Sequence, residues 1–153
     1  MNFRIQGLDP AQFAALHALS DEALAGDGAM RVRIEAANAA PCRISLDDAA
    51  PGESVLLLNY LHLNAETPYR QQGPIFVRET HARYDAGEIP PALRRRTLSL
   101  RAFDAAGMMI EADLTEGAEA EALIARLFAN PEAVYIHAHY ARRGCFAAMV
   151  TRA

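Results

Sequence analysis

The chain has 153 residues, of which 52% are hydrophobic and 22% are charged, and its formal net charge is −4. This length and composition fit one globular domain, residues 1–153, with room for a sizeable core. The negative charge and the lack of a basic stripe argue against nucleic acid or an anionic membrane as the main partner, and no apolar stretch approaches the length of a signal peptide or a transmembrane helix.

All 15 basic residues are arginines. Chemistry that depends on lysine, such as Schiff-base formation or a phosphate-loop lysine, is therefore excluded. The run Arg94–Arg96 is typical of a solvated helix face. Because no signal peptide or transmembrane segment is recognised, we expect a cytoplasmic protein. In that reducing compartment the two cysteines, Cys42 and Cys145, are expected to be free thiols.

Short strand-like segments dominate the first half of the chain. Asp9 and Pro10 predict the start of a helix, and Ser20 caps a second one. Strands are predicted at 3–6, 30–35, 42–46, 55–63 and 75–79. Segment 55–63 is apolar on both faces and should be a central strand. Segment 31–35 should be an exposed edge strand, which offers a pairing surface for a homodimer.

The second half of the chain combines two hairpins with a helix. Its strands are predicted at 97–103, 108–114, 134–140 and 145–150. The first two form a hairpin, and the last two form a C-terminal β-hairpin around the turn 141–144. An amphipathic helix spans 116–129. Because this helix separates 108–114 from 134–140, we expect a crossover that makes those two strands parallel.

The predicted elements define the fold class. Strands outnumber helices and mostly follow one another directly, and the chain has no internal repeat, low-complexity tract or linker. This order is typical of an α+β protein. We therefore expect a mixed, mostly antiparallel sheet with helices packed on at least one face and a C-terminal β-hairpin.

Two histidines, His137 and His139, mark the most informative segment. They lie two residues apart in a predicted strand, so both imidazoles leave the same face of the sheet. A co-facial pair of imidazoles in an apolar strand is uncommon for stability alone and therefore suggests a site. With His62, near the end of segment 55–63, they are the candidate catalytic residues, because histidine exchanges protons near neutral pH.

Polar residues recur where three predicted strands end, at 59–62, 78–81 and 137–140. If the sheet brings two of these ends together, histidine, arginine and tyrosine side chains converge at one rim, where open sheets commonly place binding sites. If the strands are antiparallel neighbours, their ends separate instead.

Three arginines inside predicted strands suggest an anion site. A buried guanidinium at Arg43, Arg78 or Arg101 needs an acidic partner or a bound anion. The alternative is an edge strand or an exposed strand face on which the arginine stem lies flat. In the anion interpretation these arginines bind a carboxylate or phosphate, and Tyr60 and Tyr140 orient the ligand.

The same histidines allow a metal site as an alternative. His137 and His139 together with His62 would supply three ligands for zinc or another transition ion. The sequence contains neither a Cys-x-x-Cys nor a His-Glu-x-x-His motif, so the spacing does not name a metal, and the cofactors stay unknown.

The two cysteines are candidate reactive thiols. Cys145 follows Arg142 and Arg143, and positive charge beside a cysteine favours reactivity. A hairpin loop with an even number of residues puts Cys145 on the face opposite to the histidines, and an odd number reverses this. For Cys145 and for Cys42 the alternative is a small core residue.

Several separated motifs occur in one order along nearly the whole chain. They are Pro41–Ala49 with Pro51–Glu53, Leu56–Tyr60, Tyr69–Arg70 with Gly73–Glu79, and Tyr135–His139 with Gly144–Cys145. In this order they resemble domain-of-unknown-function family 1203, a bacterial family of single-domain proteins of about this length. The resemblance implies a bacterial protein with this organisation, and it implies no activity or catalytic residue.

Three functions fit these observations. The first is an anionic small-molecule site, either binding or enzymatic, in which the arginines hold the charge and the histidines exchange protons. The second is a transition-metal site on the histidine strand. The third is a non-catalytic interaction domain, in which the polar strand residues are edge and surface features. The first explains the largest number of the residues singled out, and whether the protein is an enzyme stays open.

Overall fold

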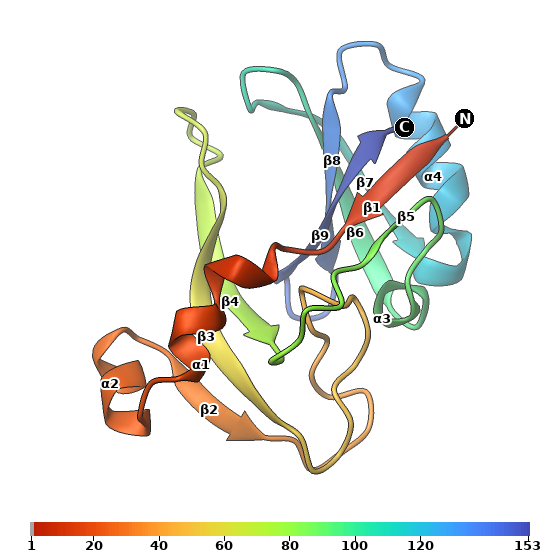
Figure 1. Cartoon of the computed structure of the whole chain (residues 1–153). Coiled ribbons are helices and arrows are strands. Elements are labelled where there is room, and N and C mark those ends of the chain that lie inside the picture. The colour runs from red at the N-terminus through yellow and green to blue at the C-terminus, as the bar shows by residue number, and fades with distance from the viewer. Residues whose placement is uncertain (1) are drawn as a thin grey trace.

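The computed structural model describes residues 2–153 and contains two sheets that lie side by side, with α4 flanking one sheet and α1 and α2 beside the other (Figure 1). The strands are β1 (Phe3–Gln6), β2 (Met30–Arg33), β3 (Ser54–Leu63), β4 (Gln71–Val77), β5 (Asp85–Ala86), β6 (Thr97–Phe103), β7 (Met109–Glu116), β8 (Tyr135–Tyr140) and β9 (Phe146–Arg152). The helices are α1 (Ala14–His17), α2 (Asp21–Gly26), α3 (Pro91–Arg94) and α4 (Ala120–Phe128), with 3-10 turns at Pro10–Gln12 and Gly117–Glu119. The α+β prediction is confirmed.

The larger sheet has six strands in the order β5-β1-β9-β8-β6-β7. The predicted C-terminal hairpin, β8 and β9, lies at its centre, with His139 opposite Phe146. The first strand pairs with the last, so that Phe3 lies opposite Arg152. Strands β7 and β8 both run antiparallel to β6, which lies between them. They are therefore parallel, as expected, but they are not neighbours.

The smaller sheet has the order β2-β3-β4, and both pairings are antiparallel. As predicted, β3 is the central strand. Leu56 packs in one cluster with Phe13 and Leu24, whereas the adjacent Val55 packs in another with Ile34. Successive side chains of a strand point to opposite faces, so this division explains why the segment is apolar at consecutive positions.

The main core lies between the six-stranded sheet and α4. Buried positions of α4, including Ile124 and Leu127, share a cluster with Leu98 and Ile136 of the sheet. The predicted helix 116–129 is shorter than expected because Gly117–Glu119 forms a 3-10 turn. A Cβ atom on Gly117 would overlap the backbone carbonyl of Leu93 in α3. Only glycine therefore fits at this position beside α3.

Two other local predictions differ from the structure, although a helical turn does begin at Pro10 with Asp9 as its cap. Segment 42–46 is a loop, joined to other segments by the isolated bridges Pro41↔Asp48 and Cys42↔Phe76. Within it, the Leu46 amide donates to the Cys42 carbonyl, and Leu46 has a φ of 51°, which closes a turn that a strand would not allow. The helix that starts at Asp9 is also broken, into a 3-10 turn and the single turn of α1.

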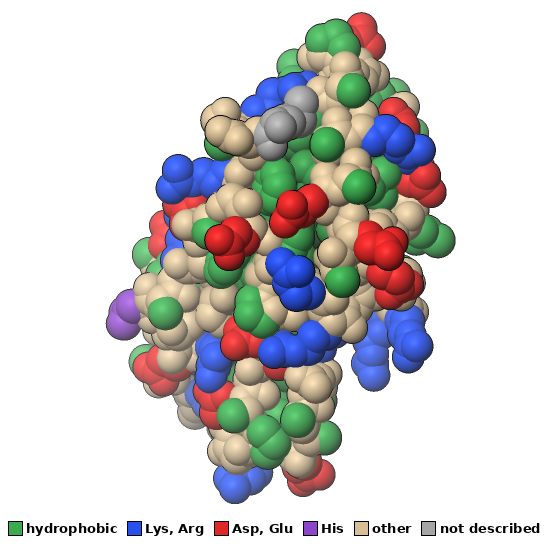
Figure 2. Space-filling model, turned by 90° about the vertical axis from the view of Figure 1, so that its right-hand side faces the viewer, with side chains coloured by type: hydrophobic (Ala, Val, Ile, Leu, Met, Phe, Trp, Pro, Cys, Tyr) green, Lys and Arg blue, Asp and Glu red, His purple; other side chains and the backbone are tan. Residues whose placement is uncertain are grey.

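The surface carries charges of both signs. On the face shown in Figure 2, arginine and acidic side chains are interspersed, with hydrophobic side chains scattered among them. Opposite charges on this face therefore lie close enough to offset one another. Within residues 2–153, none of the helices combines the length and apolarity that crossing a bilayer requires.

Candidate functional site

The loop between β2 and β3 places Arg43 between the two sheets. Its backbone amide donates to the carbonyl of Phe76 in β4 at 3.0 Å, which ties the loop to the smaller sheet. Its side chain extends to the larger sheet, where Nε donates to the carbonyl of Phe146 at 2.7 Å. A second nitrogen, NH1, donates to the carbonyl of Pro41 at 2.5 Å.

The Arg43 guanidinium is a buried cation without an acidic partner. The residue is 2% exposed, and within residues 2–153 no carboxylate forms an ion pair with it. Burial lowers the pKa of this side chain, although a guanidinium stays charged in proteins. Its two hydrogen bonds reach neutral carbonyls, so the positive charge is not compensated.

Tyr140 at the end of β8 lies beside this cation. The Cζ atoms of Arg43 and Arg96 are 5.0 Å and 5.2 Å from the centre of its ring. Its hydroxyl is buried and has no hydrogen-bond partner among the described residues. Burial raises the pKa of Tyr140 to about 12. At neutral pH the phenol therefore keeps its proton, which it can donate to a ligand.

Arg43 and Tyr140 line one pocket of about 590 Å³. Its apolar wall includes Leu57 and Phe76 of the smaller sheet, and the hairpin turn contributes Arg142, Arg143 and Cys145. Both turn arginines are exposed. The wall also contains Glu116, whose carboxylate accepts a hydrogen bond from Thr97 Oγ1 at 2.9 Å. The pocket thus combines an apolar side with cations at its base and rim.

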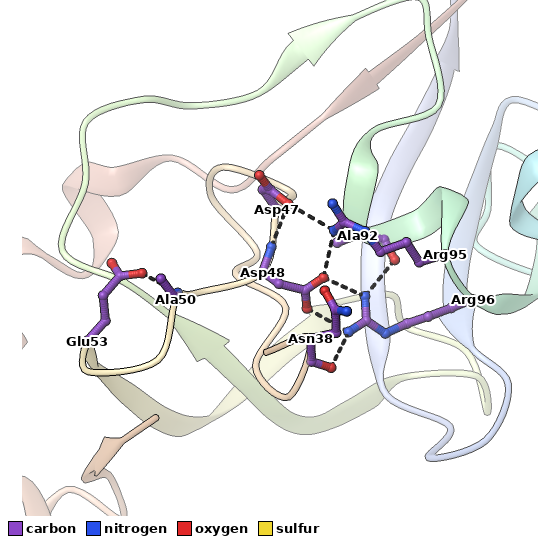
Figure 3. A network of polar contacts seen from close by, with 8 residues as sticks. All are labelled: Asn38, Asp47, Asp48, Ala50, Glu53, Ala92, Arg95 and Arg96. Atoms are coloured by element: carbon purple, nitrogen blue, oxygen red, sulfur yellow. Dashed lines mark hydrogen bonds and ion pairs between the residues drawn. The ribbon is translucent and has the colours of Figure 1, made fainter. Parts of the chain in front are cut away.

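A network of ion pairs closes one side of the pocket (Figure 3). Asp48, whose side chain is 6% exposed, accepts from Arg95 at 2.9 Å and from Arg96 at 2.6 Å. Arg95 also reaches Asp47 at 3.1 Å. Arg96 further donates to the carbonyls of Ala92 and Asn38. These carboxylates offset the charges of Arg95 and Arg96, so the uncompensated positive charge of the pocket lies on Arg43 and the two turn arginines, and Glu116 adds one negative charge to its wall.

The three candidate histidines also come together, outside this pocket. The His62 ring centre lies 6.0 Å from that of His137 and 5.1 Å from that of His139, and His62 stacks on Phe146 at 5.0 Å. The Nδ1 atom of His139 donates to the carbonyl of Gly144 at 2.9 Å. Two of the three predicted strand ends therefore meet, because His62 near the end of β3 lies beside the histidines of β8.

Burial sets the protonation state of this cluster. Burial and the neighbouring histidines, together with the positive charge of Arg101, lower the pKa of His137 to about 3. Burial and the charge of Arg101 lower the pKa of His139 to about 4. Within residues 2–153 no group of three or more His, Cys, Asp and Glu side chains is placed to hold a metal ion. This arrangement therefore gives the metal alternative no support.

The histidines adjoin a second pocket of about 390 Å³, which His62, His137 and Tyr135 help to line. Arg101 lies near them and donates from Nε to Ser99 Oγ at 3.2 Å. The lining of this pocket includes no arginine, and the lining of the larger pocket includes no histidine. The structure thus divides the predicted histidine and arginine site into two.

Two predicted ligand-binding residues lie away from both pockets. Arg78 forms an ion pair with Glu53, and the Tyr60 hydroxyl donates to Gln12 at 3.2 Å. Strands β3 and β4 are antiparallel neighbours, so the end of β4 that precedes Arg78 lies far from the end of β3 that carries His62. For these two strands the alternative prediction holds, in which the ends of antiparallel neighbours lie apart.

The hairpin register separates Cys145 from the histidines. The Tyr140 amide donates to the Cys145 carbonyl at 2.9 Å, and His139 lies opposite Phe146. The turn 141–144 therefore has four residues, the even case, and Cys145 lines the pocket of Tyr140. A register shift between Ala138 and His139 then places His137 opposite Met149.

Sequence reasoning missed the contribution of the run Arg94–Arg96. Arg96 is partly buried and lines the larger pocket together with Arg95. Three consecutive arginines could have indicated an anion site, but they were interpreted as a solvated helix face. Asp47 and Asp48, which hold these arginines, lie almost 50 positions earlier in the sequence, as in the pairing of Asp48 with Arg96.

Comparison with known proteins adds a family and no activity. The family model described as "Protein of unknown function (DUF1203)" matches residues 39–152. No curated protein and no solved structure matches the chain significantly. The matched range contains Arg43, Tyr140 and the histidine cluster, and every residue that lines the two pockets lies within it except Asn38. Because the match covers most of its length, this chain belongs to the DUF1203 family.

Proposed function

We propose that this protein binds a small anionic molecule in the pocket of Arg43 and Tyr140. The observation that carries the proposal is the Arg43 guanidinium, 2% exposed and without a carboxylate partner among the described residues. An unpaired buried charge destabilises a fold by several kcal/mol unless something compensates it. A bound carboxylate or phosphate would supply that compensation.

Two further features of the pocket support an anion. The Tyr140 hydroxyl is buried and has no partner, so it is a donor in need of an acceptor. Arg142 and Arg143 stand exposed at the rim, where positive charge raises the rate at which anions arrive. The volume of about 590 Å³ lies in the range of small-molecule sites.

The apolar wall narrows the ligand class. Leu57, Pro74 and Phe76 face the pocket from the smaller sheet, so the proposed ligand has an apolar or aromatic part in addition to its carboxylate or phosphate. We place the protein in the cytoplasm, where Cys42 and Cys145 stay the free thiols that they are here. The proposal assigns the histidines no part in binding, because His62 and His137 line the other pocket and His139 lines neither.

A thermal-shift titration tests this function. Inorganic phosphate and aromatic mono- and dicarboxylates would be titrated against wild type, the double variant Arg142→Gln/Arg143→Gln, and Arg33→Gln, a control that removes one positive charge from the exposed edge strand β2. At about one hundred times its dissociation constant, a ligand specific to the folded state adds roughly 2.7 kcal/mol of stability.

We expect at least one anion to stabilise wild type and Arg33→Gln, and to stabilise the double variant less. The proposal fails if no anion shifts the melting temperature, or if the double variant and wild type respond equally.

A further inference from the structure

We propose that Cys145 is a nucleophilic thiol that exchanges with anionic disulfides held in the arginine pocket. This inference rests on the proposed function, because the same cations would bind the disulfide. It adds to that function a reaction and a chemical class of partner. The anion would be one half of a low-molecular-weight disulfide that carries carboxylates.

The position of the sulfur supports the inference. Cys145 is a free, partly exposed cysteine that lines the pocket beside Arg142 and Arg143. Its Sγ atom has one hydrogen-bond contact, a long one of 3.8 Å to the carbonyl of Arg143. The thiol is therefore only weakly held, and an incoming ligand can reach it. Nucleophilic cysteines occupy partly exposed, electropositive surroundings of this kind.

A second feature of the pocket, independent of the cysteine, points to a bound ligand. The Tyr140 hydroxyl is buried, has no partner and belongs to a residue that is 6% exposed. Tyr140 lines the same pocket and lies directly across the hairpin from Cys145. A buried donor without an acceptor carries a desolvation cost. A carboxylate of the disulfide ligand would remove that cost while its sulfur lies near Sγ.

The other cysteine provides an internal comparison. Cys42 is 0% exposed, and its sulfur accepts from the backbone amides of Ile44 and Arg78, both at 3.4 Å. It is thus closed to solvent, whereas Cys145 is not. Reactivity of the folded protein toward a disulfide therefore reports on Cys145.

The proposed step is an exchange without an external oxidant. The Cys145 thiolate attacks one sulfur of the disulfide RS–SR, a new Cys145–S–SR bond forms, and the original S–S bond breaks. The other half leaves as the thiolate RS⁻ and takes up the proton that Cys145 released, giving RSH. The protein thiol is oxidised and the ligand is reduced, so atoms and electrons balance.

The test compares two aromatic disulfides that each release a chromophore. Dithiobis(nitrobenzoate) is a dianion, and dithiodipyridine is uncharged at neutral pH. Rates would be measured for wild type, Cys145→Ser, Arg142→Gln/Arg143→Gln and the control Arg33→Gln, with mass spectrometry to locate the mixed disulfide. For each protein, the rate with the anionic disulfide is divided by the rate with the neutral one. This ratio is then divided by the same ratio for free cysteine, which corrects for the different intrinsic reactivities of the two probes.

We expect a normalised ratio of about ten or more in wild type, since charged clefts raise association rates by at least this factor. The ratio should fall toward one in the double arginine variant and at high salt, stay unchanged in Arg33→Gln, and disappear with the fast reaction in Cys145→Ser. Labelling of Cys42 in the folded protein, or a ratio near one in wild type, would overturn the inference.

Phosphate and carboxylate stabilisation of Cys145→Ser separates the two proposals. If the anions stabilise this variant while the wild-type ratio is near one, the anion site holds and the thiol chemistry is wrong. If no anion stabilises it and the ratio is near one, both proposals fail.

Discussion

The Nε atom of Arg43 donates to the backbone carbonyl of Phe146 at 2.7 Å, while the ring of Phe146 stacks on His62 at 5.0 Å. Phe146 thus contacts the buried arginine through its backbone and the histidine cluster through its side chain. It therefore links Arg43, which lines one pocket, to His62, which lines the other.

Replacement of Arg43 tests how far it holds the sheets together. In Arg43→Met the apolar stem is kept, but the carbonyls of Phe146 and Pro41 lose their donor. We expect the free energy of unfolding to fall by about 2 kcal/mol, because the cost of leaving two buried carbonyls without a donor exceeds the gain from removing the uncompensated charge. Urea unfolding measures this change, with Arg33→Met on the exposed edge as control. A loss in Arg43→Met no larger than in the control would contradict a structural role for these bonds.

Tyr140→Phe should have opposite effects with and without ligand. The Tyr140 hydroxyl has no partner, so its removal should raise the free energy of unfolding of the ligand-free protein by up to about 1 kcal/mol. The same change should weaken stabilisation by whichever anion the titration identifies. Urea unfolding with and without that anion measures both effects. A ligand-free variant that is less stable than wild type would contradict an unpartnered Tyr140 hydroxyl.

Asp48 holds Arg95 and Arg96 at the side of the pocket (Figure 3). Asp48→Asn removes the charge from a side chain that is 6% exposed and leaves Arg96 without its carboxylate. We expect a loss of about 2 kcal/mol in the free energy of unfolding, since breaking one side of a buried pair leaves a charge uncompensated. Denaturant unfolding measures it.

Asp21→Asn is the matched control for this change. Asp21 pairs with Arg31 at the surface and is 81% exposed, and such pairs contribute little. Equal effects of the two substitutions would show that the Asp48 network does not stabilise the fold.

The histidine cluster predicts a loss of stability in mild acid. The folded-state pKa values of about 3 for His137 and about 4 for His139 lie below the ordinary value of 6.5. The unfolded chain therefore binds protons that the folded chain does not. Stability is fully present above pH 6.5 and falls as the pH drops toward these folded values. Each of the two histidines should remove about 1.4 kcal/mol per pH unit within this window.

Urea unfolding between pH 7.5 and 5 measures this slope, because carboxylates titrate mainly below that range. His137→Phe should reduce the slope by the contribution of one histidine, whereas substitution of the exposed His81 should leave it unchanged. An unchanged slope in His137→Phe would contradict the lowered pKa of His137.

Gly117 and Gly26 should respond oppositely to alanine. A Cβ at Gly117 would overlap the carbonyl of Leu93, whereas a Cβ at Gly26 in α2 meets nothing within 4 Å. We expect Gly117→Ala to lower the melting temperature through a loss of 2 kcal/mol or more, about the upper range of overpacking costs. Gly26→Ala should be neutral or add about 0.5 kcal/mol. Calorimetry decides between these outcomes and a similar response at both sites.

Elements specified by local sequence were predictable. The hairpin of β6 and β7 follows from alternation around the turn 104–107, and the C-terminal hairpin follows from that around 141–144. The central position of β3 followed from its apolar residues on both faces. In each case a short-range signal, periodicity or a turn, is sufficient.

Features that depend on long-range packing were not predictable. Segment 42–46 alternates like a strand, yet Arg43 lies in a loop because its partners, Phe76 and Phe146, lie in two different sheets. His62 and Arg78 seemed equally placed at strand ends, and only the antiparallel pairing of β3 with β4 sends them apart. Neither contacts between the two sheets nor the choice of neighbouring strands within a sheet produces a periodic pattern in the sequence.

The pairing of β1 with β9 affects how the chain folds as it is synthesised. Phe3 and Ile5 leave the ribosome early, but their partners Arg152 and Val150 emerge only after every other strand of the sheet. Until then β1 has no permanent neighbour on that side, and β8 has an open edge. Contacts this distant in sequence close slowly. The larger sheet must therefore assemble after translation of β9, and a chain stopped before Phe146 would expose two unpaired strand edges to aggregation.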